Sequence, residues 1–162
     1  MSSYGKNLRL TSYGESHSSS VGGILEGFPA NYSVDIIKIQ KQLDRRRAKG
    51  SISTARQELD KIEIHSGLKE TGESLGTPIG FLVKNKDIKP EDYKKSQGEG
   101  ENYIPRPSHA DYTYLMKYGI HASSGGGRSS ARETISRVVG GAIAEQYLES
   151  KYNCTIVAWV SK

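Results

Sequence analysis

Arginines gather at four places along this sequence, and each place has the chemistry of an anion-binding site. Arg45–Arg47 are consecutive, Arg56 lies in the segment after them, Arg106 precedes a proline, and Arg128–Arg132 brackets two serines and an alanine. Guanidinium groups bind phosphates and carboxylates through paired hydrogen bonds, and a helix start adds free backbone N–H groups. Each feature alone is weak, because an arginine run on a helix is more often a solvated face. The segment Arg128–Arg132, at a predicted helix start, is the best placed of the four.

Two histidines lie in contexts that suit proton transfer. His17 ends a Gly-Glu-Ser-His turn, and His109 lies just inside a predicted helix start, behind Arg-Pro-Ser. A histidine near arginines and phosphate can change its charge around neutral pH, which suits a proton donor. The alternative is a surface or hydrogen-bonding histidine, the class to which we assign His65 and His121.

The spacing of the cysteine, histidines and serines supports neither a metal site nor a serine nucleophile. The single Cys154 excludes an intrachain disulfide and a cysteine-based zinc site, and the four histidines are scattered. Neighbouring side chains such as Ser16 and His17 point in divergent directions, and neither a nucleophile elbow nor a P-loop signature is present. We therefore predict no metal site.

The composition predicts one soluble, cytoplasmic domain with a lean core. The chain has 162 residues, of which 35% are hydrophobic and 18 are glycine. No stretch approaches the roughly 20 apolar residues of a membrane helix, and the N-terminus has no apolar signal core. A net charge of +5 favours anionic partners, which are phosphorylated metabolites, nucleic acid or an acidic surface.

The hydrophobic pattern predicts helices mixed with strands. Ser33 and Ser108 are the expected N-caps of two helices, and Gly119 is the expected stop of the second. The predicted strands are 4–11, 21–26, 61–65, 77–83 and 155–160, and the predicted helices are 34–46, 108–118 and 130–149. Strands 61–65 and 77–83 are expected to pair, 48–57 to form a basic loop and 84–104 a flexible connector. The fold class is α+β, or a layered α/β sandwich.

Four motifs in this order resemble those of the chorismate synthase family. They are Tyr13–His17 (YGESH), Leu43–Arg47 (LDRRR), Arg106–Tyr114 (RPSHADYTY) and Gly125–Thr134 (GGGRSSARET). The resemblance covers nearly the whole chain but only the N-terminal part of the longer family chain. It implies that residues 1–162 are the N-terminal portion of a single domain, in which helices pack with antiparallel sheets.

The resemblance implies a carbon–oxygen lyase of the shikimate pathway, which leads to the aromatic amino acids. The family converts 5-enolpyruvylshikimate 3-phosphate to chorismate by anti-elimination of phosphate and a ring proton, and it requires reduced FMN. NADPH is the implied source of electrons for the flavin, and a homotetramer is the implied assembly. Neither nucleic acid nor a membrane is an expected partner.

Site residues follow by the same resemblance. His17 would protonate the departing phosphate or the neighbouring group, and His109 would donate a proton to the reduced flavin. Arg47 and Arg56 mark a loop that would contact NADPH or substrate. The implied substrate-binding residues are Ser16, Arg47, Arg106, Ser130, Ala131 and Arg132, and the implied flavin-binding residues are Arg128, Ser129 and Ser130.

The chain departs from the family pattern in ways that leave other functions open. Ser18 stands where the family usually has glycine, the loop after Arg47 lacks the usual Pro-Gly, and the family's aspartate base lies beyond Lys162. The expectation is therefore a chain that holds part of the active site. A truncated non-catalytic relative and a basic RNA-binding module are the alternatives, although RNP, KH and helix-turn-helix signatures are absent.

Overall fold

The computed structural model describes residues 2–46, 59–86, 88, 102–122 and 125–159 of the chain. These residues form one antiparallel five-stranded sheet with the strand order β1-β2-β3-β5-β4. The strands are β1 (Ser3–Tyr4), β2 (Arg9–Gly14), β3 (Ser20–Glu26), β4 (Ile62–Ile64) and β5 (Ile79–Lys84). The helices are α1 (Ile36–Arg46), α3 (Asp111–Tyr118) and α4 (Thr134–Tyr152). The predicted α+β class is confirmed.

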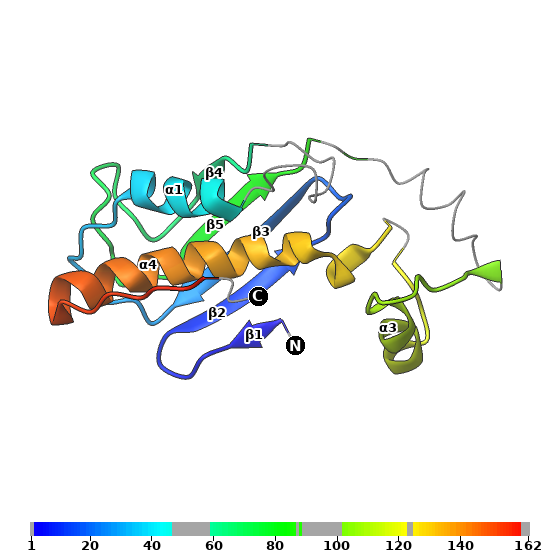
Figure 1. Cartoon of the computed structure of the whole chain (residues 1–162). Coiled ribbons are helices and arrows are strands. Elements are labelled where there is room, and N and C mark those ends of the chain that lie inside the picture. Colours follow the sequence, from blue (N-terminus) through cyan, green and yellow to red (C-terminus); the bar gives the residue numbers. More distant parts are fainter. Residues whose placement is uncertain (1, 47–58, 87, 89–101, 123–124, 160–162) are drawn as a thin grey trace.

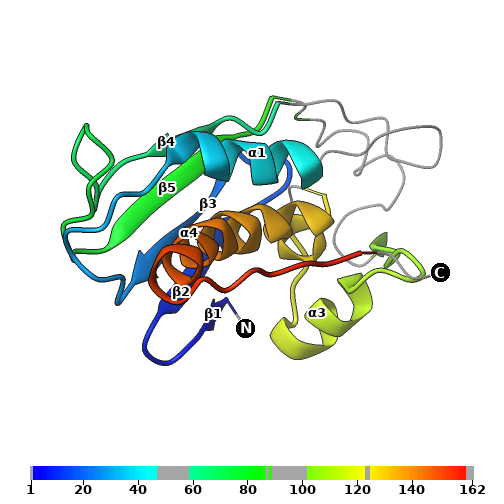
Figure 2. The same ribbon diagram turned by 60° about the vertical axis from the view of Figure 1, so that its left-hand side comes forward.

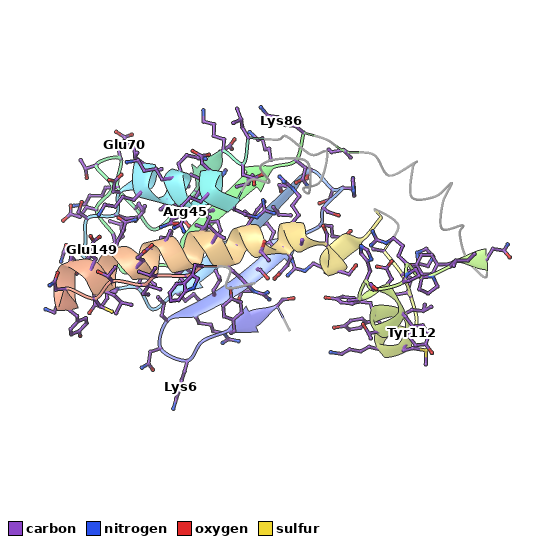
Figure 3. All side chains as sticks on the ribbon, viewed as in Figure 1. Lys6, Arg45, Glu70, Lys86, Tyr112 and Glu149 are labelled. Carbon is purple, nitrogen blue, oxygen red and sulfur yellow. The ribbon has the colours of Figure 1, made fainter. Side chains whose placement is uncertain are left out.

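Helices α1 and α4 form a second layer on one face of the sheet, while α3 lies beyond the start of α4 and away from the sheet (Figures 1 and 2). The two covering helices run antiparallel, since Lys38 near the start of α1 is paired with Glu149 near the end of α4 at 2.9 Å. Figure 3 labels Glu149 at one end of this layer and Arg45 near the C-terminal end of α1. The C-terminal end of α1 therefore lies beside the start of α4.

The core fills the space between the sheet and these two helices. In α4 the apolar residues recur every fourth position, which places them along one side of the helix. The buried residues are Leu25, Ile79, Phe81 and Val83 from the sheet and Ile39, Leu43, Ile135, Val139 and Ile143 from the helices. Helix α4 packs closely on the sheet at Gly140, where an added Cβ would lie 2.8 Å from Leu10 Cδ2.

The observed helix starts differ from the predicted ones. Asp35, and not Ser33, caps α1, because its carboxylate accepts the N–H groups of Ile37 and Lys38. Helix α3 begins at Asp111 without a side-chain cap, and Ser108, the predicted cap, has a φ of 60°. The predicted stop of α3 at Gly119 is confirmed by its left-handed backbone.

The helix predicted from residue 130 begins four residues later. Two 3₁₀ turns, Gly127–Ser129 and Ala131–Glu133, precede α4, which starts at Thr134 and extends to Tyr152. Ser130 caps the second turn by accepting the N–H of Arg132. Over a stretch this short, the sequence pattern does not distinguish a 3₁₀ turn from the first turn of an α-helix.

Three of the five predicted strands are confirmed in position, namely 21–26, 61–65 and 77–83, and the expected pairing of the last two is present. The strand predicted at 4–11 is interrupted by a turn at Gly5, whose φ is +93°, so that β1 and β2 fold against each other. The strand predicted at 155–160 is wrong over its described residues 155–159, which are exposed and lie outside any ladder. β-Favouring residues form a strand only where a partner ladder is available. The predicted loop 48–57 and most of the connector 84–104 lie outside the described residues.

Candidate active site

The sheet has one end at which several candidate residues converge. Strands β2 and β5 finish there, and β3 and β4 begin there, as the pairings Gly14↔Val21, Ser20↔Lys84 and Ile62↔Val83 require. The C-terminal end of α1 and the turns before α4 reach the same place. We call this region the polar end, and its members are residues 14–20, Arg46, Asp60, Asn85 and 128–134.

A buried carboxylate holds two arginines together at the polar end. Asp60, which is 1% exposed, accepts hydrogen bonds from Arg46 at 2.6 Å and from Arg132 at 2.9 Å. Arg46 also donates to Thr134 Oγ1 and to the carbonyl of Ala131. A buried charge is tolerated only when it is paired and hydrogen-bonded. Asp60 therefore joins α1 to the start of α4 and fixes the direction of both guanidinium groups.

Asn85 continues this network toward the turn that carries His17. Continuing the β4–β5 register places Asn85 opposite Asp60, and its backbone N–H donates to the Ser19 carbonyl at 2.9 Å. Its side-chain oxygen accepts Arg132 Nε at 2.6 Å. Its amide nitrogen donates to the carbonyls of Glu15 and Ser18 at 2.8 Å and 2.7 Å.

The turn at residues 15–19 is closed by a serine hydroxyl. Ser18 Oγ accepts the Glu15 N–H at 3.1 Å, and its one proton is within donating distance of the Glu15 carbonyl at 3.0 Å and of the Ser20 carbonyl at 3.1 Å. The predicted substrate contact Ser16 is buried within this turn, and the predicted acid His17 is half-buried. The backbone that carries His17 is thus bonded both within the turn and from the neighbouring strand by Asn85.

Arg128, a predicted flavin contact, lies against β2. Its guanidinium donates to the Gly14 carbonyl at 3.0 Å, to Ser12 Oγ at 2.6 Å and to Glu133 Oε1 at 3.3 Å. Glu133 also accepts the buried Ser12 hydroxyl at 2.8 Å. This group ties the segment before α4 to the end of β2, immediately before the His17 turn.

A second polar cluster fixes the start of α3. Arg106 donates through Nε and a terminal nitrogen to the two carboxylate oxygens of Asp111, at 2.7 Å and 3.0 Å. Ser129 donates to the same carboxylate at 2.8 Å. Burial by itself would raise the pKa of Asp111, but hydrogen bonds from Arg106 and Ser129 outweigh it and hold the pKa well below its usual range. An added Cβ at Gly126 would meet the Arg106 guanidinium at 2.7 Å, so the glycine loop packs closely on this pair.

His109 is exposed beside this cluster. Its Nδ1 lies 3.0 Å from the Pro107 carbonyl, which can only accept, so this hydrogen bond places the ring proton on Nδ1. The neutral ring then presents Nε2 as its proton-accepting atom.

A cleft of about 380 Å³ separates α3 from the β2 side of the molecule. Arg128 and Ser129 line it, as do Glu15 and Asp111, whereas the other predicted site residues that the structure describes do not. Tyr103 and His121 also line it and stack face to face, with ring centroids 3.9 Å apart. His121, assigned from the sequence to the surface or hydrogen-bonding class, also has its Nδ1 3.2 Å from the Ala122 carbonyl.

The structure places the remaining predicted residues as follows. Ala131 is exposed and Ser130 half-buried beside the polar end, while Arg132 is buried and bonded to Asp60 and Asn85. Arg47 and Arg56 lie outside the described residues. Among those described, the histidine, cysteine and acidic side chains form no group suited to a metal ion, and no helix is long and apolar enough to cross a membrane.

Asp60 and Asn85 are the residues that reasoning from motifs missed. Each is a polar residue beside a predicted strand, Asp60 just before 61–65 and Asn85 shortly after 77–83. The expected pairing of those strands did not fix their register, and it is the register in the structure that places the two side chains opposite one another.

The fold is α+β, and at the polar end of its sheet three arginines, Arg46, Arg128 and Arg132, lie beside the His17 turn. The family model for chorismate synthase matches residues 8–162. The chain is 57% identical to the chorismate synthase of Schizosaccharomyces pombe over 162 residues, which cover 99% of this chain and 40% of that protein. It is 53% identical to that of Saccharomyces cerevisiae, covering 100% of this chain and 42% of the relative. A solved chorismate synthase structure aligns with a TM-score of 0.61 and 30% identity, over 90% of this chain and 35% of the solved one.

This chain belongs to the chorismate synthase family. It spans about two fifths of the length of the curated relatives it matches.

Proposed function

We propose that this chain forms the N-terminal part of a chorismate synthase active site, which eliminates phosphate from 5-enolpyruvylshikimate 3-phosphate. In this reaction the C–O bond to phosphate breaks, the phosphate leaves with that electron pair, and a ring C–H bond gives up its proton as a new double bond forms. One observation carries the proposal for a member of this family. The His17 turn and two predicted ligand arginines, Arg128 and Arg132, meet at the polar end of one sheet.

His17 is the proposed acid for the departing phosphate. Its turn is bonded through the Glu15 and Ser18 carbonyls to Asn85 and closed by the Ser18 hydroxyl. A general acid acts well only when its proton is held within hydrogen-bond reach of the leaving group. The fixed turn supports this role, because it limits the positions that the imidazole can take.

Arginines are the proposed binding groups for the phosphate and the two carboxylates of the substrate. The Arg106 side chain is 25% exposed beside Asp111, so part of it is accessible to a ligand. Arg132 is oriented by Asp60 and Asn85 and contributes its positive charge from below the surface. Ser16, Ser130 and Ala131 complete the proposed set at the polar end, and Arg47 and Arg56 are proposed for the loop outside the described residues.

Reduced FMN is the proposed cofactor, and the cleft beside α3 suits it. The stacked pair Tyr103–His121 offers a planar face, and Arg128 offers a cation to a phosphate group. Arg128, Ser129 and Ser130 would hold the flavin, which when bound supplies the electron chemistry of the elimination. His109 is the proposed proton donor toward the flavin: with Nδ1 bonded to the Pro107 carbonyl, the protonated ring carries its second proton on Nε2, and this is the proton it would give up.

The remaining parts of the proposal concern the complete protein. NADPH is the proposed electron source for the flavin, a homotetramer the proposed assembly, and the cytoplasm the proposed location. These follow from the family resemblance, and none of them changes the chemistry assigned above.

A chimera tests the proposed activity without assuming that this chain acts alone. The segment of the Saccharomyces cerevisiae relative that matches this chain is replaced by this chain, with which it shares 53% identity. Anaerobic chorismate formation is then measured with reduced FMN and 5-enolpyruvylshikimate 3-phosphate, by the absorbance of the product. The same assay on this chain alone reports whether the matched segment is sufficient.

We expect turnover by the chimera and none by the chain alone. A folded chimera that binds substrate and flavin but forms no chorismate would contradict the proposal. Turnover by the chain alone would show instead that the complete catalytic set lies within these 162 residues.

A further inference from the structure

Asn85 is the residue at which three parts of the polar end meet. Its side chain is 7% exposed and contacts Arg132 on one side and the turn at residues 15–19 on the other. It lies just after β5, opposite both Asp60 and Ser19 in the extended registers of the two neighbouring strands. The resemblance assigned no role to this residue.

The hydrogen bonds of Asn85 use both halves of its amide. The oxygen accepts the Arg132 Nε–H, and the nitrogen donates its two protons to the Glu15 and Ser18 carbonyls. The reverse orientation would point an N–H group at a guanidinium and an oxygen at two carbonyls, so the partners allow one orientation only. No other side chain of this size offers one acceptor and two donors in this arrangement.

The far side of the network is also fixed. Arg132 is held by Asp60, which accepts from Arg46 with its other oxygen. The direction in which Arg132 presents its Nε–H to Asn85 is therefore set by Asp60, two residues before β4, and through it by Arg46 of α1. Because Asn85 accepts from Arg132 and donates to the Glu15 and Ser18 carbonyls, it links this fixed guanidinium to the backbone of the His17 turn.

We propose that Asn85 is a positioning residue, whose side-chain amide holds the His17 turn in a fixed position relative to Arg132. The inference rests on the proposed function for the role of His17, but the ordering of the turn is a property of the chain itself. It predicts that loss of the two amide donors loosens residues 15–18 while the core remains intact.

Two substitutions separate the two halves of the amide. Asn85→Asp keeps the acceptor for Arg132 and removes both donors to the turn, whereas Asn85→Ala removes every side-chain bond. Lys84→Ala is the matched control, because Lys84 is adjacent in the chain, exposed, and paired only with Glu63 among the described residues.

The first measurement is amide hydrogen exchange on this chain, with ring NMR signals of His17 recorded on the same samples. We expect the Glu15 and Ser18 amides to exchange at least tenfold faster in both Asn85 variants and within twofold of the parent in Lys84→Ala. The amide of Val139 in α4 should be unchanged in Asn85→Asp, which separates local loosening from unfolding. Equal exchange of the turn amides in parent and Asn85→Asp would overturn the proposal.

The second measurement is turnover in the chimera. We expect Asn85→Asp to lower kcat about tenfold with KM within twofold, because the acid is displaced while the ligand arginines keep their places. A loosened turn with unchanged kcat would overturn the claim that Asn85 contributes to catalysis by positioning His17. If the parent chimera forms no chorismate, the proposed function fails, whereas hydrogen exchange still decides whether Asn85 orders the turn.

Discussion

The two candidate proton donors are held in different ways. His17 lies in a turn bonded from the interior, where the buried side chains of Asp60, Asn85 and Arg132 form one network. His109 lies on an exposed arm, residues 102–122, which a hydrogen bond from Ser129 to Asp111 joins to the segment before α4.

This difference has a physical cause in how far apart the partners are in the sequence. The polar end joins segments that are distant along the chain, so its order depends on the whole two-layer fold. The arm depends mainly on the local pair Arg106–Asp111, five residues apart, and on one loop that packs against it. Removing the buried carboxylate of the polar end should therefore affect stability and chemistry together, whereas substitutions in the arm should affect the site more than the core.

The largest expected effect is on turnover. In the chimera, His17→Ala and His109→Ala should each slow chorismate formation by roughly 10²–10⁴-fold with little change in substrate affinity, the usual scale for a lost general acid. His65→Ala, at an exposed histidine that directly follows β4, is the control. Turnover near the parental rate in either site variant would remove that histidine from the mechanism.

The next effect is on the stability of the polar end. Asp60→Ala should lower the free energy of unfolding by about 3–5 kcal/mol, because it leaves the buried Arg132 without its carboxylate. Asp44→Ala, at an exposed carboxylate on α1, should change it by less than about 0.5 kcal/mol. Urea unfolding measures both, and equal midpoints for the two variants would show that the network does not stabilise the fold.

A smaller effect, which depends on pH, is expected in the arm. Asp111→Asn should cost about 1–3 kcal/mol near neutral pH through its weakened bonds to Arg106 and Ser129. Because the pKa of Asp111 is depressed in the folded chain, its contribution is present above the unfolded value of about 4 and is lost as the pH falls below it.

Unfolding measured from pH 7 downward should therefore show the parent and Asp111→Asn converging in acid. A constant difference between the two chains over the whole range would contradict the assignment of the shift to Asp111.

The smallest effect concerns the serine that closes the His17 turn. Ser18→Gly removes the hydroxyl bonds to Glu15 and Ser20 but leaves the Ser18 carbonyl as an acceptor for Asn85. We expect a loss of about 1 kcal/mol in unfolding free energy and a smaller change in turnover than Asn85→Asp causes. A larger change in turnover than that of Asn85→Asp would mean that Ser18, and not Asn85, is the main constraint on the turn.

The sequence predicted those parts of the fold whose signals are local. The sequence pattern of neighbouring residues predicts the buried apolar face of α4 and the end of α3 at Gly119. It also predicts the pairing of β4 with β5, which are close together in the chain. The strand at 155–160 was predicted from composition alone, and composition does not supply a partner ladder.

In the candidate site, too, the residues of local motifs were predicted, whereas contacts between distant segments were not. Motifs located the His17 turn and the segment at 128–132, but not the burial of Arg132, because its carboxylate partner lies 72 residues away in the chain. Asn85 was missed for the same reason. Its importance depends on three contacts with residues that are distant in sequence and adjacent only through the strand register.

The most direct test of the account is the solved structure of the chimera with 5-enolpyruvylshikimate 3-phosphate bound. The account predicts that the ligand lies between the polar end and the exposed arm, with its phosphate in hydrogen-bond reach of His17 and its charged groups facing Arg106 and Arg132. A ligand bound elsewhere, with the polar end and the arm both unliganded, would contradict it.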